Sequence, residues 1–259
     1  MNANKVYVID NENSPEYRKI QNVEYISKAA IEKNGYSDLH FHRIIHTAQI
    51  YSREINAFNE KQMFQVNVSL GRSLAQLAVK QNSLFYSFSS KFQFMSVNST
   101  YANQKKLFDE EILLMKESKL NWIRIFLGDT YGPNDNRDKI VNQIFKSIKN
   151  EQSLKISNPN RVIRLAFIED IKSSLCSVNY PGNYSYVSSN VVSLGELVSQ
   201  CEVIAEKKSH ISWGSRSKKI KQEDEFTIIQ DNVNLDGYLQ NETQLSIGLQ
   251  KVWKQIVSN

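Results

Sequence analysis

The sequence predicts an α/β fold in which helices cover both faces of a parallel sheet. Over the first half of the chain, short β-branched or aromatic segments alternate with longer segments of helical periodicity. This β-α-β-α order is typical of a Rossmann-like, doubly wound parallel sheet. The pattern changes after the Tyr131-Gly132-Pro133 turn, so we expect a Rossmann-like domain over residues 1–135 and a small mixed lobe over residues 136–259. Some elements of the lobe are expected to return to the first domain.

The elements of the first domain follow from short apolar runs and helical spacing. KVYVID at residues 5–10 has the pattern of a buried strand that ends in an acid. Residues 58–82 predict a long helix, because Phe64, Val68 and Leu74 recur near helical spacing. The remaining patterns predict strands at 22–27, 42–48, 83–90 and 121–127, and a helix at 101–118.

The second half of the chain predicts three helices and two strands. Residues 138–150 place apolar side chains on one face of a helix. Ser193 and Glu196 have the spacing of a capping box, so a helix is expected to begin there. The other patterned segments predict a strand at 161–171 that turns into an acidic helix start, a strand at 184–189 and a final amphipathic helix at 241–257.

Charge and hydropathy narrow the classes of partner. The net charge is +5, and the densest basic segment is residues 207–222, which EDE follows directly. We favour a solvated loop for this segment, with a phosphate-binding loop as the alternative. No helix-turn-helix or RNP-like pattern accompanies it, so no nucleic-acid partner is expected. No apolar run approaches the roughly 18 residues that span a bilayer, so no membrane partner is expected either.

Cysteine and histidine usage indicates neither disulfides nor a metal. Cys176 and Cys201 are the only cysteines and lack metal-ligand spacing, which predicts a reduced, cytoplasmic protein. The N-terminal segment is too short and too polar for a secretory signal. Three of the four histidines cluster at residues 40–46 without an accompanying carboxylate pattern, so we expect no metal site.

Tyr101 and Lys105 share one face of the helix predicted at 101–118, and two interpretations stay open. The stripe continues through Phe108 and Ile112, which favours a core role for Tyr101. A lysine on such a stripe must snorkel or find a partner, however. An ammonium near a phenol lowers the pKa of that phenol towards the working range, so the two residues are also a candidate proton-transfer pair.

Two strand ends add candidate ligand groups. Ser90 ends the strand predicted at 83–90, at the position where parallel sheets present groups to ligands, and its hydroxyl is suited to hydrogen-bond a substrate carbonyl. Asp10 ends the strand at 5–10, where a carboxylate can bind both hydroxyls of an adenosine ribose and repel a 2′-phosphate. That interpretation favours NAD over NADP, and a turn-capping role for Asp10 is the alternative.

An ordered set of segments resembles a known family. The segments are VYVIDN (6–11), RIIHTA (43–48), VNVSLGRSL (66–74), FSS (88–90), YANQK (101–105), RIFLGDTYGPND (124–135), RVIRLAFIEDI (161–171) and VSLGELV (192–198). In this order they resemble the extended short-chain dehydrogenase/reductase family, also called the NAD-dependent epimerase/dehydratase family. TYGPNDNRDKIVNQIFKSI looks most like the nucleotide-sugar 4-ketoreductases of the CDP-abequose and CDP-paratose synthase type.

The resemblance implies roles for particular residues. Tyr101 would be the proton donor, Lys105 would lower its pKa and hold the nicotinamide ribose, and Ser90 would orient the keto oxygen. The implied function is NAD(P)-dependent reduction of a 4-keto-6-deoxysugar nucleotide, with an epimerase or dehydratase, or an inert sugar-nucleotide-binding protein, as alternatives. A homodimer is expected. The other implied residues are Asp10, Thr47, Ala48 and Asn67 for the cofactor, and Arg216 and Lys219 for the substrate pyrophosphate.

The chain also departs from the family pattern. The glycine-rich GxxGxxG turn that holds a pyrophosphate is absent from these residues, and the match begins at the second strand of the family. We therefore expect a sheet that lacks its first strand, and weak cofactor binding by these residues. Either a shortened reductase or a binding protein without dinucleotide chemistry fits, and the retained Ser90, Tyr101 and Lys105 favour the first. Lys91 and Phe92 stand where dehydratases carry an Asp-Glu pair, which counts against dehydration.

Overall fold

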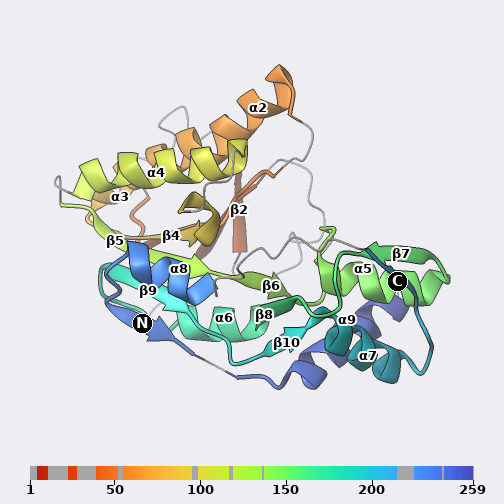
Figure 1. Cartoon of the computed structure of the whole chain (residues 1–259). Coiled ribbons are helices and arrows are strands. Elements are labelled where there is room, and N and C mark those ends of the chain that lie inside the picture. Colours follow the sequence, from red (N-terminus) through yellow and green to blue (C-terminus); the bar gives the residue numbers. More distant parts are fainter. Residues whose placement is uncertain are drawn as a thin grey trace.

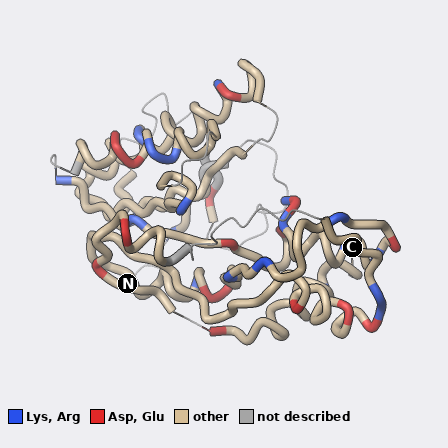
Figure 2. Tube along the Cα trace, in the orientation of Figure 1, with Lys and Arg blue, Asp and Glu red and all other residues tan. Residues whose placement is uncertain are grey.

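The computed structural model describes most of the chain. The described residues are 5–10, 23–27, 39–51, 55–94, 99–116, 119–135, 137–214, 225–240 and 242–258. Figure 1 shows the elements, and Figure 2 shows acidic and basic residues interspersed along the described chain.

The elements follow one another in an α/β order. They are β1 (Val6–Asp10), β2 (Val23–Ser27), β3 (Arg43–His46), α2 (Ala57–Phe64), the π-helical turn η2 (Gln65–Leu70), α3 (Gly71–Gln81), β4 (Leu84–Ser90), the short 3-10 helix η3 (Lys91–Gln93), α4 (Thr100–Lys116), β5 (Asn121–Leu127), β6 (Asp129–Tyr131), α5 (Ile140–Asn150), β7 (Ser153–Ile156), β8 (Val162–Phe167), α6 (Ile168–Leu175), β9 (Gly182–Tyr186), β10 (Val191–Ser193), α7 (Leu194–Ala205), β11 (His210–Trp213), α8 (Glu225–Asn232), β12 (Gly237–Leu239) and α9 (Leu245–Ser258).

A five-stranded parallel sheet in the order β12-β9-β5-β4-β3 forms the centre of the fold. Helices α3 and α4 cover one face, where Phe85 and Trp122 of the sheet pack with Phe108 of α4. The other face packs Ile123 and Ile125 against Ile171 of α6. Burial on both faces explains why β5 is apolar over most of its length. The predicted doubly wound parallel fold is confirmed.

Strands β1 and β2 pair in parallel as a separate two-stranded sheet. The ring of Tyr7 in β1 lies 5.6 Å from that of Phe41, next to β3, in an edge-to-face contact. Strand β3 ends the order of the larger sheet, and Ile45 on it is 51% exposed. The absence of a first strand, expected from the sequence, remains a prediction.

The C-terminal half contributes to two regions. Helices α5, α7 and α9 pack together around Ile144, Phe145 and Leu197. This cluster is flanked by the β10-β8-β6 sheet and by the β7-β11 pair. Strands β9 and β12 instead extend the five-stranded sheet, so segments on both sides of residue 136 build the central layer.

Most predicted elements are present, within a few residues of their expected ends. The long helix at 58–82 is one continuous run of α2, η2 and α3. The capping box of Ser193 and Glu196 is formed at the start of α7. The elements not predicted from the sequence have three to eight residues, which are too few positions to show a period; they are β6, β7, β10, β11, β12 and α8.

Three properties of the described residues bear on membranes, disulfides and metals. None of its helices has the length and apolar content needed to cross a bilayer. Cys176 is exposed, Cys201 is buried, and both are free thiols. The same residues contain no cluster of three or more His, Cys, Asp or Glu side chains that could hold a metal ion.

Candidate active site

The candidate site lies where β3 and β4 end beside helix α4. All three strands β3, β4 and β5 run in parallel, with His46 paired to Ser87 and Ser90 paired to Leu127. Their carboxyl ends therefore share one edge of the sheet, which is where open α/β sheets bind ligands.

Lys105 is a buried cation that joins α4 to the end of β4. Its residue is only 2% exposed, and its Nζ donates a hydrogen bond of 2.5 Å to the backbone oxygen of Phe88. The same Nζ lies 5.9 Å from the ring centroid of Tyr101, one helical turn earlier. Burial lowers the pKa of Lys105 to about 8; the nearby Asp109 carboxylate opposes this shift and Arg124 adds to it. The lysine has thus found a polar partner inside the fold.

Tyr101 is half-buried, and its ring meets that of Tyr51 edge-on, with the centroids 5.5 Å apart. The buried part of the helical stripe is formed further along α4 by Phe108 and Ile112. Burial raises the pKa of the Tyr101 phenol, and the positive charge of Arg137 lowers it. Tyr101 therefore lies at the margin of the core, and its role as a site residue remains a prediction.

Arg137 is a cation of the site that sequence reasoning missed. Its guanidinium forms a two-pronged ion pair with Asp135, with Nε–Oδ1 and Nη2–Oδ2 distances of 2.7 Å. The ion pair raises the pKa of Arg137 and holds its charge near Tyr101. The resemblance assigned the pKa-lowering role to Lys105, whereas Arg137 is the cation that acts on the Tyr101 phenol here. The only signal in the sequence was the polar NDNRD segment after Gly132-Pro133.

Ser90 closes β4 and begins the short helix η3. Its Oγ accepts a long hydrogen bond, 3.4 Å, from the backbone N–H of Phe92. A serine hydroxyl also carries one O–H donor, which this contact does not use. Ser90 can therefore donate to an acceptor at the sheet edge.

Asn67 supports the loop that follows β3. It is fully buried in the π-helical turn η2, a type of distortion often found at functional sites. Its side chain accepts from the N–H of Ile50 at 2.8 Å, and donates to the backbone oxygen of Ile50 at 2.9 Å and to Gln104 of α4 at 3.0 Å. The loop that carries Thr47 and Ala48 is thereby tied to α4.

A second charged cluster, near Lys105, joins α4, β4 and β5. Asp109 and Arg124 are 3% and 7% exposed and form a buried ion pair. The hydroxyl of Ser89 lies 2.9 and 3.1 Å from the two carboxylate oxygens of Asp109, and it accepts from Arg124 Nε at 3.1 Å. Sequence reasoning missed this cluster. Two features of the sequence could have indicated it: Arg124 interrupts an apolar strand, and Asp109 lies one helical turn after Lys105.

The structure brings together most of the residues predicted for the site. Ser90, Tyr101 and Lys105 lie around the end of β4, and Asn67 braces the loop with Thr47 and Ala48. Asp10 ends β1, but its side chain lies outside the described part of the structure. Arg216 and Lys219 also lie outside the described residues.

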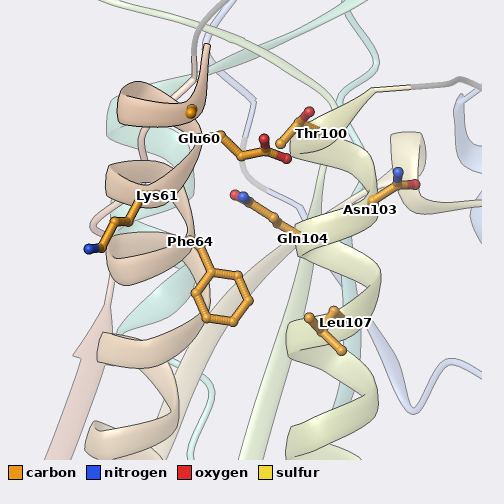
Figure 3. A pocket seen from close by; sticks show the side chains of 8 residues that line it. Glu60, Lys61, Phe64, Thr100, Asn103, Gln104 and Leu107 are labelled. Carbon is orange, nitrogen blue, oxygen red and sulfur yellow. The ribbon is translucent and has the colours of Figure 1, made fainter. Parts of the chain in front are cut away.

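A groove of about 480 Å³ lies between α2 and α4 (Figure 3). Phe64 of α2 and Leu107 of α4 point into it from facing helices. Its lining residues are Ala57, Glu60, Lys61, Phe64, Thr100, Asn103, Gln104 and Leu107. None of Ser90, Tyr101 or Lys105 lines it, so this groove is a surface separate from the candidate active site.

Comparisons with known proteins agree on one fold. The chain matches no protein-family model. Its sequence is 24% identical over 163 residues to a CDP-abequose synthase from Salmonella muenchen, a match that covers 60% of this chain and 55% of the synthase. A UDP-N-acetylglucosamine 4-epimerase from Methanobrevibacter ruminantium, in complex with UDP-N-acetylmuramic acid, superposes with a TM-score of 0.77 at 17% identity. That match covers 98% of this chain and 91% of the epimerase.

A UDP-glucose 4-epimerase from Thermus thermophilus, in complex with NAD, superposes with a TM-score of 0.73 at 13% identity, over 97% of this chain and 91% of that chain. The resemblance to the extended short-chain dehydrogenase/reductase family is confirmed. At such low identities the solved structures establish only the fold, a Rossmann-like α/β fold, and the sequence match spans about half of the synthase.

His46 at the end of β3 is buried next to this site. It is 2% exposed, its ring lies 5.8 Å from that of Phe108, and its Nε2 has no hydrogen-bond partner among the described residues. Burial, together with the positive charge of Lys105, lowers the pKa of His46 to about 4. The native state therefore keeps the imidazole neutral.

We predict that His46 makes the fold sensitive to acid. Because the folded pKa lies below the unfolded value of 6.5, the unfolded state binds the proton first as pH falls, and stability is lost between pH 6.5 and about 4. The loss attributable to this group is about 3 kcal/mol. Urea unfolding at pH 7 and pH 4.5 should show a smaller pH effect in His46→Gln than in wild type. The control His42→Gln replaces an exposed histidine and should behave as wild type. An equal loss of unfolding free energy between pH 7 and pH 4.5 in all three proteins would refute the prediction.

Proposed function

We propose that the chain is an NAD(P)-dependent nucleotide-sugar oxidoreductase that reduces the keto group of a 4-keto-6-deoxysugar nucleotide. The observation that carries the proposal is the position of Lys105. Its ammonium lies between the Phe88 backbone oxygen, two residues before Ser90, and the ring of Tyr101. A phenol, an ammonium and a hydroxyl thus border the edge of a parallel sheet where ligands bind. The ligands named for the solved relatives, NAD and a UDP-sugar, support this ligand class.

The described residues fit the nicotinamide end of such a cofactor. A lysine ammonium has three N–H donors, and the Phe88 contact accounts for one. The remaining donors are suited to ribose hydroxyls at the sheet edge. Thr47 and Ala48, held by Asn67 through Ile50, would form the neighbouring wall. The preference for NAD through Asp10 remains a prediction.

The chemistry assigned to the chain is proton transfer and positioning. NAD(P)H, when bound, supplies the hydride that reaches the carbonyl carbon. Tyr101 Oη gives its proton to the keto oxygen, so that C=O becomes CH–OH. Ser90 Oγ donates a hydrogen bond to the same oxygen and fixes its position. The positive charge of Arg137 favours the phenolate that remains.

Two other functions stay as alternatives. An epimerase would use the same three residues to oxidise and then reduce one carbon, and the epimerase names of the solved relatives favour it as the second candidate. Dehydration is disfavoured by Lys91 and Phe92 at the positions after Ser90. The third alternative is a protein that binds a sugar nucleotide with this fold but catalyses no reaction. The absence of nucleic-acid and membrane partners and the cytoplasmic location remain predictions.

Replacement of Tyr101 tests the proposed proton donor. We expect Tyr101→Phe to lower the rate of NADH or NADPH oxidation with CDP- or dTDP-4-keto-6-deoxysugars by at least about 100-fold, because the variant lacks the transferable proton. The matched control is Tyr180→Phe, which removes a hydroxyl from a side chain that is 78% exposed, and it should retain the wild-type rate. Equal rates for Tyr101→Phe and wild type, or no turnover by wild type, would rule out this function.

The groove of Figure 3 supports a homodimer as part of the proposal. Phe58 and Phe64 on α2 are 72% and 38% exposed, and Leu107 and Leu114 on α4 are 37% and 69% exposed. Leu107 and Leu114 are seven residues apart and share one helix face. We propose that α2 and α4 pack against the same helices of a second copy, which would cover these side chains.

A charge placed on this surface should separate the copies. We predict that wild type sediments as a dimer and that Leu114→Asp sediments as a monomer, because an aspartate in the interface would be desolvated without a partner. Val203→Asp is the control, since Val203 is 77% exposed on α7, far along the chain from this surface. Analytical ultracentrifugation of the three proteins decides; a monomeric wild type, or a dimeric Leu114→Asp, contradicts the interface.

A further inference from the structure

The end of β4 is fastened to α4 at two successive residues. The backbone oxygen of Phe88 accepts from Lys105, and the hydroxyl of Ser89 is held by Asp109 and Arg124. Ser90, the candidate substrate-orienting residue, follows directly. Its position therefore depends on contacts made by its two neighbours.

Arg124 is itself held rigidly on the neighbouring strand β5. Its guanidinium carbon lies 4.4 Å from the ring centroid of Phe126 and 5.4 Å from that of Trp122. It pairs with Asp109, which stands on α4 one turn after Lys105. Strand β5, strand β4 and helix α4 thus meet in one buried polar cluster.

We propose that the Asp109–Arg124 pair is a positioning element of the candidate site, which clamps the end of β4 to α4 and balances the charge beside Lys105. The proposal rests on the proposed function in that Lys105 is a site residue. Neither member of the pair is assigned a contact with substrate. They act through Ser89 and through the electrostatic environment of Lys105.

Asp109 and Arg124 shift the pKa of Lys105 in opposite directions. The carboxylate of Asp109 favours the protonated form of Lys105, and the guanidinium of Arg124 disfavours it. The two opposite charges of the intact pair largely cancel, so burial is the main cause of the lowered pKa of Lys105. Removal of one partner leaves the other charge uncompensated in a dry environment, where a charge acts strongly on its neighbours. Loss of Asp109 and loss of Arg124 must therefore move the protonation of Lys105 in opposite directions.

Other titratable groups face Lys105 from the surrounding elements. His46 on β3 interacts with its charge, and Tyr101 lies one turn before it on α4. Strand β4 contributes the Phe88 carbonyl, and β5 contributes Arg124. His46 is neutral at the pH where Lys105 titrates, so the Asp109–Arg124 pair supplies the ionic environment to be tested.

The test is an NMR titration of Lys105 in the protein labelled with ¹³C at lysine Cε, without substrate or cofactor. The Lys105 signal is assigned by its loss in Lys105→Arg. We expect Asp109→Asn to lower the pKa of Lys105 by about 1, and Arg124→Gln to raise it by a similar amount. Arg124→Lys keeps the positive charge and should titrate close to wild type. If Asp109→Asn does not fold, the comparison of Arg124→Gln with Arg124→Lys decides.

The matched control is Glu110→Gln, the next residue along α4. Glu110 pairs with Lys106 at the surface, with side-chain exposures of 57% and 65%. Loss of this exposed carboxylate should leave the titration of Lys105 unchanged. An unchanged Lys105 titration in Asp109→Asn, or identical titrations in Arg124→Gln and Arg124→Lys, would overturn the proposal and leave a purely structural ion pair. Because no turnover is measured, failure here is distinct from failure of the proposed reaction.

Discussion

The burial of the Lys105 ammonium at the end of a parallel strand is the constraint on which the site depends. Removing a charge from water is costly, so the amine must meet a polar partner in a fixed place. The Phe88 backbone oxygen is that partner, and it belongs to the strand that ends in Ser90. The same contact places Tyr101, one turn earlier on α4, at the edge of the sheet.

The remaining polar groups around the site stabilise this arrangement. The Asp109–Arg124 pair holds Ser89, and Asn67 holds the loop after β3 through Ile50. The Asp135–Arg137 pair, on the segment after β6, supplies a positive charge to the Tyr101 phenol. This charge supports the proposed chemistry, because a phenol is a better general acid when its pKa lies closer to the working pH and a nearby cation lowers that pKa.

The sequence predicted the elements of the fold in which a helical or strand pattern extends over many residues. Residues 58–82 and 121–127 carried clear patterns, whereas three-residue strands such as Asp129–Tyr131 did not, and they form only because neighbouring strands pair with them. Spacing also predicted that Tyr101 and Lys105 lie on one helix face, where the structure has them 5.9 Å apart from ammonium to ring centroid, and their catalytic roles remain predictions. The pairing of Asp109 with Arg124, and of Arg137 with the Tyr101 phenol, joins different elements of the fold, and one sequence contains no signal for which charges meet in space.

Hydrogen exchange at the end of β4 measures the central feature most directly, because it reports whether this strand end is held to α4. The peptide that spans β4 (Leu84–Ser90) should exchange its amide hydrogens as slowly as the peptide that spans β5 (Asn121–Leu127), since both open only when the core opens. Mass spectrometry after exchange into heavy water gives both rates. Fast exchange at Phe88–Ser90 beside protected residues 85–87 would show a frayed strand end and would contradict a rigid site built on Lys105.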